Sequence, residues 1–158
     1  MLDAKELRRV MGHFATGVTI ITTHDGVGGV YGLTANAVTS VSLVPPLLLV
    51  CIDRKAESFP HFFASGVFAV NVLAAEQEHL SARFAKSGGD KFAGVPHRRG
   101  TLGAPILEGA LAWTECRIVA SHEAGDHVMH VGEVAAADAP GGDPLLFHQG
   151  RYRRLASG

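Results

Sequence analysis

Apolar residues recur with a helical period at the start of this chain and with a strand-like period through most of the rest. Residues 3–14 predict an amphipathic helix, and Asp3 with Glu6 resembles a capping box at its start. The apolar residues of that helix fall on one face: Leu7, Val10, Met11 and Phe14. Gly17 ends the helical pattern.

The segments that follow are short, rich in β-branched residues, and separated by turns that contain glycine, which is typical of strands joined by hairpins. Predicted strands cover residues 18–23, 30–41, 47–52, 67–73, 111–120 and 127–137. The strand 30–41 is expected to be irregular around Thr34–Asn36, and the unbroken apolar run 47–52 is expected to be buried on both faces. Residues 145–155 are predicted to form a last strand or a hairpin around Gln149-Gly150. Short helices are predicted between Ser58 and Gly66 and over 76–84, and residues 87–100 are predicted to form a polar loop. About six or seven hairpin-linked strands favour an antiparallel barrel with short helices over a doubly wound parallel sheet.

Composition places the chain among ordinary globular proteins. Its 158 residues are 47% hydrophobic and 18% charged, which suits a single domain over 1–158 with a real core. The net charge of -1 gives no long-range attraction to nucleic acid or to an anionic membrane. A charged N-terminus without an apolar signal core, and apolar runs too short to cross a bilayer, predict a cytoplasmic protein.

Candidate chemistry begins with the stretch Leu33–Ser58, which carries hydroxyl and amide side chains at its start and charged ones at its end. Arg54 and Lys55 supply positive charge, and the serines and threonines supply hydrogen-bond donors, as an anionic ligand such as a nucleotide phosphate requires. A polar strand end followed by a solvated loop explains the same residues equally well. Asn71 interrupts an apolar strand, so its buried amide needs partners in either a bent backbone or a ligand.

Two further clusters contain histidine. In Gly125-Asp126-His127 the aspartate could orient the imidazole at a turn, although a solvent-exposed turn histidine is the simpler interpretation. His148, Arg151 and Tyr152 could cover a ring and bind a phosphate, or form a polar tail. The chain contains no phosphate-binding loop, dinucleotide fingerprint, serine-hydrolase elbow, zinc-protease motif or CxxC, and no metal site is predicted. Cys51 and Cys116 each lie in an apolar segment and are interpreted as buried thiols in a reducing compartment, with a disulfide between them as the alternative that no sequence feature favours.

Six motifs, in order along nearly the whole chain, resemble those of the short-chain flavin reductases that serve two-component flavin-dependent monooxygenases. They are FATGVTIITT (14–23), GLTANAVTSVSLVPPLLLVCIDR (32–54), FAVNVLAAEQEHLSARFA (68–85), DKFAG (90–94), GDHVMHVGEV (125–134) and PLLFHQGRYRRL (144–155). One such motif alone is a weak signal, but six in order are a strong one.

The resemblance implies an antiparallel split β-barrel, mainly β with short helices, that binds flavin as a homodimer. It implies hydride transfer from NADH or NADPH to FMN or FAD, and a separate monooxygenase that receives the reduced flavin. By motif position, the flavin would contact Thr34, Ala35, Asn36, Ala37, Val38, Ser40 and Val41, with Ile52, Asp53, Arg54, Lys55 and Ser58 flanking its phosphate and Asn71, Arg83 and Phe84 nearby. The nicotinamide nucleotide would lie near His127 and the Phe147–Tyr152 segment, which includes His148, Arg151 and Tyr152.

This reaction requires no protein acid or nucleophile, so no catalytic residue is assigned. Two departures from the family pattern matter: Ala37-Val38 replaces a hydroxyl or aromatic pair, which favours backbone contacts there, and RKAES at 54–58 carries fewer hydroxyls, which shifts the phosphate toward Arg54, Lys55 and Ser58. Two alternatives stay open on the same kind of barrel. One is a flavin- or haem-binding module without turnover, and the other is an oxidase of a phosphorylated pyridine vitamin, which would need a larger basic cluster.

Overall fold

The structure is a computed structural model that describes residues 1–157. Its helices are α1 (Ala4–Met11), α2 (Phe59–Ser65) and α3 (Glu78–Phe84), with a 3₁₀ turn, η1 (Ala75–Gln77), leading into α3. Its strands are β1 (Thr16–Gly17), β2 (Thr19–His24), β3 (Val30–Ala35), β4 (Val38–Leu43), β5 (Pro46–Asp53), β6 (Val67–Val72), β7 (His97–Arg99), β8 (Pro105–Leu107), β9 (Ala112–Ala124), β10 (His127–Asp138), β11 (Leu146–His148) and β12 (Arg151–Arg153).

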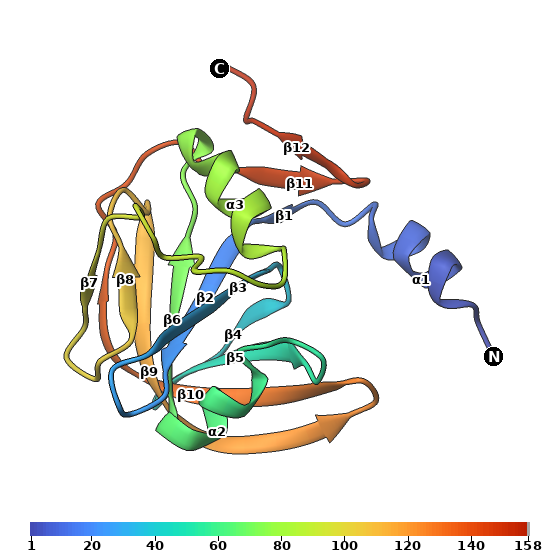
Figure 1. The fold of residues 1–158 in the computed structure, drawn as a ribbon. Coiled ribbons are helices and arrows are strands. Elements are labelled where there is room, and N and C mark those ends of the chain that lie inside the picture. The colour runs from blue at the N-terminus through green and yellow to red at the C-terminus, as the bar shows by residue number, and fades with distance from the viewer. Residues whose placement is uncertain (158) are drawn as a thin grey trace.

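Seven strands form one antiparallel sheet in the order β3-β2-β6-β9-β10-β5-β4. The edge strands β3 and β4 follow each other in the sequence and are joined at Asn36–Ala37, yet within the described residues β3 pairs only with β2 and β4 only with β5. The sheet curls so that its two edges meet at this joint and diverge from it (Figure 1). The antiparallel split barrel with short helices is therefore confirmed, and the irregularity predicted around Thr34–Asn36 is the break between β3 and β4.

Strands β9 and β10 form the longest hairpin, with 13 and 12 residues. Register shifts at Val131/Gly132 and Val134/Ala136 bend it, as bulges do. At Gly132 a side chain would have no room, because a Cβ there would lie 2.5 Å from the Phe68 ring. The hairpin therefore runs through the middle of the sheet and ends in a tip just beyond the last β10–β5 pair, His127 with Asp53.

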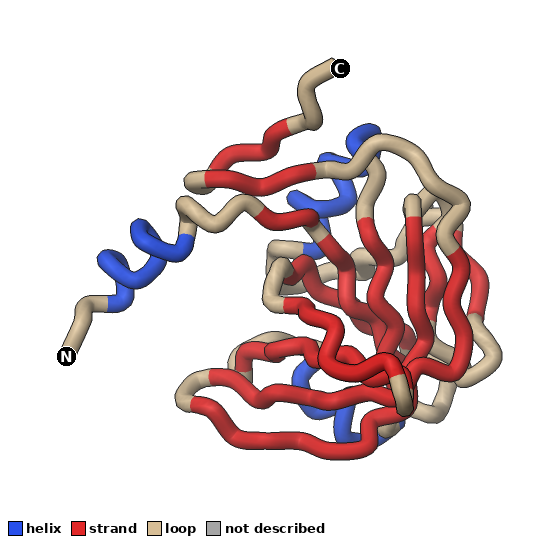
Figure 2. Tube along the Cα trace, turned by 180° about the vertical axis from the view of Figure 1, so that it is seen from behind, coloured by secondary structure: helices blue, strands red, loops and turns tan. Residues whose placement is uncertain are grey.

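Two small sheets flank the barrel. Strands β1, β11 and β12 form one of them beside α3, and β7 with β8 forms the other at the side of β9 (Figures 1 and 2). The predicted terminal hairpin around Gln149-Gly150 is confirmed as β11–β12. The predicted loop 87–100 contains β7, which sequence periodicity does not reveal because the strand has only three residues.

The apolar side chains gather in two main clusters. One lies between the barrel and α3 and includes Val18, Ile20, Leu73, Leu80, Phe84, Phe92 and Leu145. The other fills the barrel beside α2 and includes Ile21, Val50, Ile52, Phe62, Phe68, Val70 and Cys116. The prediction that 47–52 is buried on both faces is wrong, since only Val50 and Ile52 are fully covered and Cys51 is half-buried on the other face.

Helix α1 departs most from the sequence-based expectation. Asp3 accepts a hydrogen bond from the Lys5 amide as its N-cap, but Glu6 pairs with Arg9 instead of completing a capping box. The helix ends at Met11, and none of its residues is buried within residues 1–157. Residues 1–14 therefore extend from the barrel as an arm (Figures 1 and 2). Among residues 1–157, no helix is long and apolar enough to span a bilayer.

Candidate functional site

An open hollow lies where the two sheet edges meet, with Asn36 at its centre. One section of the hollow has a volume of about 360 Å³ and is lined by Met11, Phe14, Thr16, Asn36, Ala37, Val38, Thr39, Leu49 and Cys51. A section of about 200 Å³ continues from Thr34, Ala35 and Asn36 toward Ser81, Ala85, Phe147 and Tyr152. Edge strands leave alternate backbone N–H and C=O groups without a strand partner. The hollow therefore offers apolar walls together with backbone hydrogen-bonding groups, which suits a flat heteroaromatic ligand.

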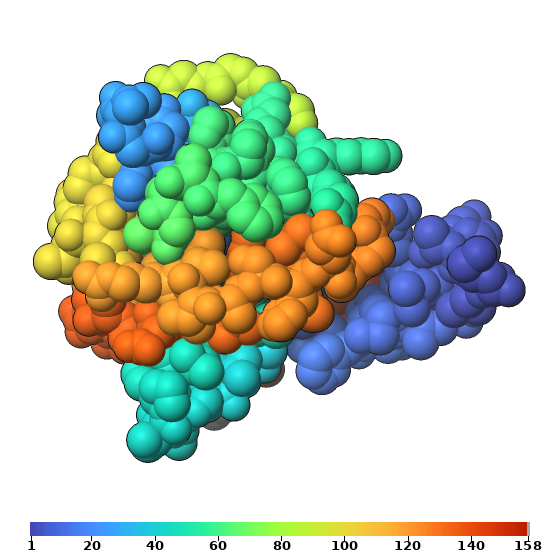
Figure 3. All heavy atoms as spheres, turned by 90° about the horizontal axis from the view of Figure 1, so that it is seen from below, coloured from blue at the N-terminus to red at the C-terminus, as the bar shows by residue number. Residues whose placement is uncertain are grey.

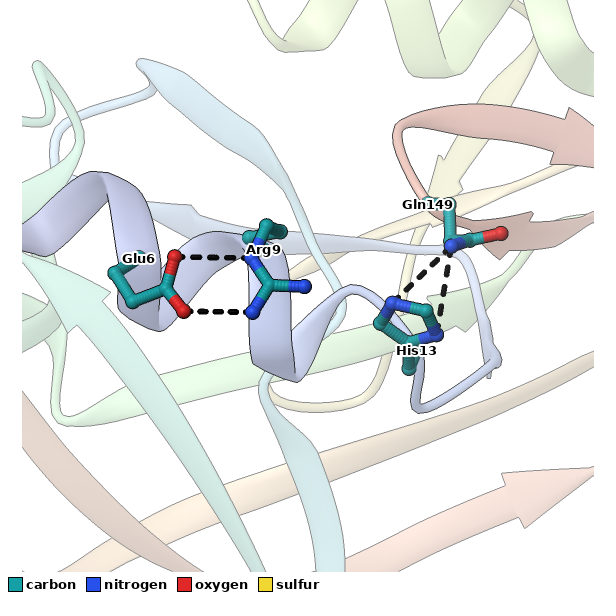
Figure 4. Close-up of polar contacts among 4 residues, drawn as sticks. All are labelled: Glu6, Arg9, His13 and Gln149. Atoms are coloured by element: carbon teal, nitrogen blue, oxygen red, sulfur yellow. Dashed lines mark hydrogen bonds and ion pairs between the residues drawn. The ribbon is translucent and has the colours of Figure 1, made fainter.

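The N-terminal arm forms one wall of this hollow, through Met11 and Phe14. The arm is tied to the β11–β12 hairpin, because the Gln149 amide donates to the Gly12 carbonyl at 2.8 Å. The Gln149 side-chain amide nitrogen also lies 3.2 Å from Nε2 of His13 (Figure 4). Within α1, Arg9 and Glu6 form a two-point ion pair (Figure 4). The arm is therefore ordered by its helix and its base, although its apolar face is uncovered.

Tyr152 is held rigidly at the other side of the hollow. Its hydroxyl lies 2.6 Å from Oγ of Ser81 on α3, and Thr34 Oγ1 donates to the Ser81 carbonyl at 2.7 Å. The Phe147 and Tyr152 rings are in edge contact, with centroids 5.5 Å apart. The structure thus brings the predicted flavin residues 34–36 next to the aromatic residues of the terminal hairpin.

The charged end of Leu33–Ser58 lies beside a different hairpin. Asp53 is directly opposite His127 in the β5–β10 register, so residues 53–55 adjoin the Gly125-Asp126-His127 turn. His127 Nδ1 lies 2.7 Å from Asp126 Oδ1, and this hydrogen bond holds the pKa of Asp126 below its usual range. The aspartate therefore orients the imidazole at the turn.

Ser58 lines a notch of about 100 Å³ together with Glu57, Gly89, Asp90 and Lys91. The side chain of Ser58 is buried, and its hydroxyl has no hydrogen-bond partner among residues 1–157. A buried hydroxyl without a partner is uncommon and indicates a ligand or a water. Ser58 stands at the N-cap position of α2, but its side chain makes no capping hydrogen bond.

The loop after α3 was missed as part of the site by sequence reasoning. Arg83 donates to the carbonyls of Asp90 and Ala93 and so folds this loop beside Ser58. Lys91 donates to the carbonyl oxygens of Gly32 and Phe84, and burial lowers its pKa. Lys86 and Lys91 line one open hollow of about 520 Å³ with Gly88 and Gly89. The signal was a Gly-Gly pair between two lysines directly after a helix, which gives flexible backbone near positive charge.

Three predicted contacts have buried side chains. Asn71 is fully buried, its amide nitrogen donates to the Ile20 carbonyl at 3.1 Å, and its oxygen accepts from the Leu107 amide at 2.8 Å. The sequence left two kinds of partner open for Asn71, a backbone or a ligand. In the structure its side-chain partners include backbone groups of the protein, so the expected contact with the flavin is corrected. Ile52 and Phe84 are core residues. Ile52 could therefore contact a ligand only through its backbone atoms. The Phe84 ring packs against the backbone of Gly32.

The remaining predicted residues lie on two separated sides of the molecule. Ser40 and Val41 are exposed on β4, beyond the hollow. His148 and Arg151 lie on the β11–β12 hairpin, whereas His127 belongs to the β9–β10 hairpin, and Figures 1 and 2 show these hairpins at opposite ends of the open side. The predicted nicotinamide residues are therefore divided between the β9–β10 and β11–β12 hairpins. Across residues 1–157, no group of three or more potential ligands is arranged to hold a metal ion.

A small antiparallel split barrel, with a hollow along its unpaired edges and cationic side chains at one end, defines a class of ligand-binding barrel suited to nucleotide-like cofactors. The chain belongs to the flavin reductase like domain family, whose model matches residues 11–156.

Individual relatives agree with this assignment. A protein named probable flavin reductase from Rhizobium meliloti is 43% identical over 152 residues, which cover 96% of this chain and 49% of that protein. The chain thus spans about half the length of this relative. The reductase subunit HsaB of a flavin-dependent monooxygenase from Mycobacterium tuberculosis is 41% identical over 155 residues, covering 96% of this chain and 82% of the relative. The structure of an NADH:FAD oxidoreductase from Streptomyces globisporus, in complex with NAD and FAD fragments, superposes with a TM-score of 0.91 at 42% identity, covering 99% of this chain and 96% of that one.

The residues of this chain fit a flavin. Residues 34–38 supply edge backbone groups beside an apolar hollow, as a planar ring requires. The unpartnered Ser58 hydroxyl and the Lys55 ammonium, which has no hydrogen bond or ion pair among residues 1–157, suit a phosphate.

Proposed function

We propose that this protein is an NAD(P)H-dependent flavin reductase that transfers hydride from NADH, or NADPH, to FMN, or FAD. The observation that carries the proposal is the hollow between the edges β3 and β4, which reaches Cys51 on β5, two residues before the Asp53 that pairs with His127. Membership of the flavin reductase like domain family supports it. The flavin, when bound, supplies the redox chemistry by accepting a hydride from the nicotinamide.

The protein binds and orients the two partners. Residues 34–38 hold the ring through backbone groups of the sheet edges, with Cys51 and Leu49 on the apolar side. Lys55 and Ser58 hold the phosphate, together with the lysine-rich loop at 86–91. The arm excludes water from the hollow through Met11 and Phe14. Rigid placement of two reactants accelerates a reaction between them without any acid or base from the protein.

The nicotinamide nucleotide is ordered by His127 on the β9–β10 hairpin and by Phe147, His148, Arg151 and Tyr152 on the β11–β12 hairpin. Because these two hairpins are apart, the proposal requires either an extended dinucleotide or a second subunit that brings them together. His127→Ala should raise the KM for NADH with flavin affinity nearly unchanged. Equal loss of flavin binding would mean that the two sites are not separate.

The primary test mixes the purified protein with NADH and with riboflavin, FMN or FAD, and follows absorbance at the nicotinamide band. Flavin-dependent loss of NADH is the expected result. A protein that binds flavin but leaves NADH intact with all three would be a binding module, and the reductase proposal would then be abandoned. Repeating the assay with NADPH gives the preference between the two nicotinamides.

The phosphate assignment has its own test in Lys55→Ala. We expect weaker binding of FMN and little change for riboflavin, which lacks the phosphate. Fluorescence quenching of each flavin on titration with protein measures both affinities. Equal weakening of both flavins would remove Lys55 from the phosphate site.

A separate flavin-dependent monooxygenase is the proposed consumer of the reduced flavin. The support is that one relative is named as the reductase subunit of such an enzyme. A cytoplasmic location belongs to the same proposal, because both cysteines are free, as in a reducing compartment.

We also propose that the protein is a homodimer. The apolar side chains of the arm are uncovered, with Phe14 71% exposed, and the β4–β5 turn exposes Leu43 at 87% and Val44 at 92%. Figure 3 shows the β4–β5 segment (cyan) and the arm (dark blue) protruding from the body. Apolar surface on two protrusions is typical of an interface. A second copy would cover both and close the hollow.

Leu7→Gln combined with Phe14→Gln should convert the dimer to a monomer in sedimentation velocity. Val27→Gln is the matched control, because Val27 is 89% exposed on the β2–β3 turn, away from the arm. A wild-type protein that sediments as a monomer at all concentrations would refute the dimer.

A further inference from the structure

Arg54 makes a set of contacts within the protein that a residue would not need in order to bind a phosphate. Its backbone amide donates to the Asp126 carbonyl at 3.0 Å, and its Nε donates to the Gly125 carbonyl at 3.3 Å. Its terminal nitrogen forms an ion pair with Glu123 at 3.0 Å. One residue of the β5 end therefore holds three positions of the β9–β10 tip.

The tip needs such a restraint. The β5–β10 register ends at Asp53 with His127, and the β9–β10 register ends at the same residue, with His127 opposite Ala124, so the turn residues Gly125 and Asp126 have no strand partner within the described residues. Turn residues outside a strand ladder open at a lower free energy than the paired strands beside them. Arg54 is the next residue after the last register pair, and it extends the contact between β5 and the tip by one step.

Lys55 behaves differently although it is the neighbouring cation. Its backbone amide donates to Asp53 Oδ1 within the turn, and its ammonium has no hydrogen bond or ion pair in residues 1–157. The guanidinium of Arg54, in contrast, is already partly neutralised by Glu123. Of the two cations at this end of β5, Lys55 is available to a phosphate and Arg54 is engaged.

We propose that Arg54 is a positioning residue for the nicotinamide, because it fixes the Gly125-Asp126-His127 turn against the end of β5, and that it is not a ligand of the flavin phosphate. This inference rests on the proposed reductase function. It replaces the phosphate role expected for Arg54 from the sequence. It also assigns a role to Glu123, which no sequence motif marked.

The first test compares Arg54→Ala with Lys55→Ala in steady-state kinetics and flavin titrations. For Arg54→Ala we expect the KM for NADH to rise roughly 3- to 30-fold, the effect of losing an exposed ion pair and a hydrogen bond to a carbonyl. The kcat at saturating NADH, and the ratio of FMN to riboflavin affinity, should stay within about twofold of wild type, since only placement of the turn is lost. Lys55→Ala should leave the KM for NADH nearly unchanged and lower the ratio of FMN to riboflavin affinity.

Two further variants separate positioning from simple charge. Arg54→Lys keeps the positive charge but lacks the planar fork that reaches Glu123 and Gly125 together, so it should retain the raised KM. The double exchange Arg54→Glu with Glu123→Arg should recover part of the loss that Arg54→Glu alone causes. A phosphate ligand predicts the opposite for both: rescue by Lys and no rescue by the exchange.

A readout without turnover keeps this inference apart from the reductase proposal. Amide hydrogen exchange of the flavin-free protein should show faster exchange at 123–128 in Arg54→Ala and unchanged exchange in Lys55→Ala. Unchanged exchange at the tip, or loss of FMN affinity with riboflavin affinity intact, would overturn the inference about Arg54. Absence of NADH oxidation by the wild-type protein with any flavin would overturn the reductase proposal instead.

Discussion

Asn71 is expected to determine stability and not flavin affinity. Replacing Asn71 with Leu removes the acceptor of the Leu107 amide and one donor to the Ile20 carbonyl, both fully inside the protein. A buried group that loses its partner costs about 1–3 kcal/mol, so one orphaned amide and one weakened carbonyl should together cost roughly 2–5 kcal/mol. Domains have about 5–15 kcal/mol of stability, so the variant should stay folded.

Urea unfolding measures this loss, and the chain offers a convenient probe. Trp113 is the single tryptophan and lies directly opposite Asn71 in the β6–β9 register, so its fluorescence reports on this part of the sheet. At about 2–4 °C per kcal/mol, the melting temperature should fall by roughly 4–20 °C. FMN affinity, measured below the transition, should change by less than about twofold if no atom of Asn71 reaches the ligand.

Asn36→Leu is the matched control, because Asn36 is an exposed asparagine whose amide donates to Thr16 Oγ1 in the hollow. It should show the reverse, with small loss of stability and clearly weaker FMN binding. An Asn71→Leu variant with wild-type stability, or with FMN binding weakened more than about tenfold while folded, would refute the reasoning from its hydrogen bonds.

Two other residue types give direct checks. Cys51 lines the hollow and burial raises its pKa, so its alkylation at alkaline pH should be slow, and bound FMN should slow it further. Cys116, with its pKa raised to about 11 by burial, should stay unmodified. Peptide mass spectrometry measures both, and equal labelling of Cys51 with and without FMN would contradict the placement of the ring in the hollow. Burial lowers the pKa of His130, so the unfolded chain takes up a proton near pH 6.5 that the folded protein resists until lower pH. Stability should therefore fall as pH drops below about 6.5 toward the lowered folded pKa, and His130→Gln should flatten that slope in urea titrations; identical slopes would disprove the contribution of His130.

The fold was predictable where local pattern and packing agree. The β-branched run at Thr19–Thr23 and the glycine turn after it give β2 and its hairpin with β3, because those residues suit only extended structure and a tight reversal. Strands of two or three residues, such as β1 and β7, leave no periodicity to detect. The arm was predicted as a helix, but its amphipathic pattern says only that one face is apolar, not what covers it.

The candidate site was predictable only as a set of segments. The order of the motifs indicated flavin chemistry, but side-chain direction decided which residues contribute. Asn71 points toward β8 and Arg54 toward the β9–β10 tip, and neither direction can be obtained from residue type. Lys91 and its glycine loop join the site through a chain reversal after α3, which requires the three-dimensional contact of Arg83 with the loop carbonyls.

The joint at Asn36–Ala37 leaves an open seam in the barrel, and the two strand edges that border this seam, β3 and β4, belong to one continuous segment of the chain. A ligand seated on that seam takes the place of missing strand-to-strand bonds. Because β3 and β4 are not paired with each other, the departure of such a ligand would break no strand pairing of the seven-stranded sheet. Such a barrel can release a cofactor as often as it is used, because the protein loses none of its own hydrogen bonds in doing so.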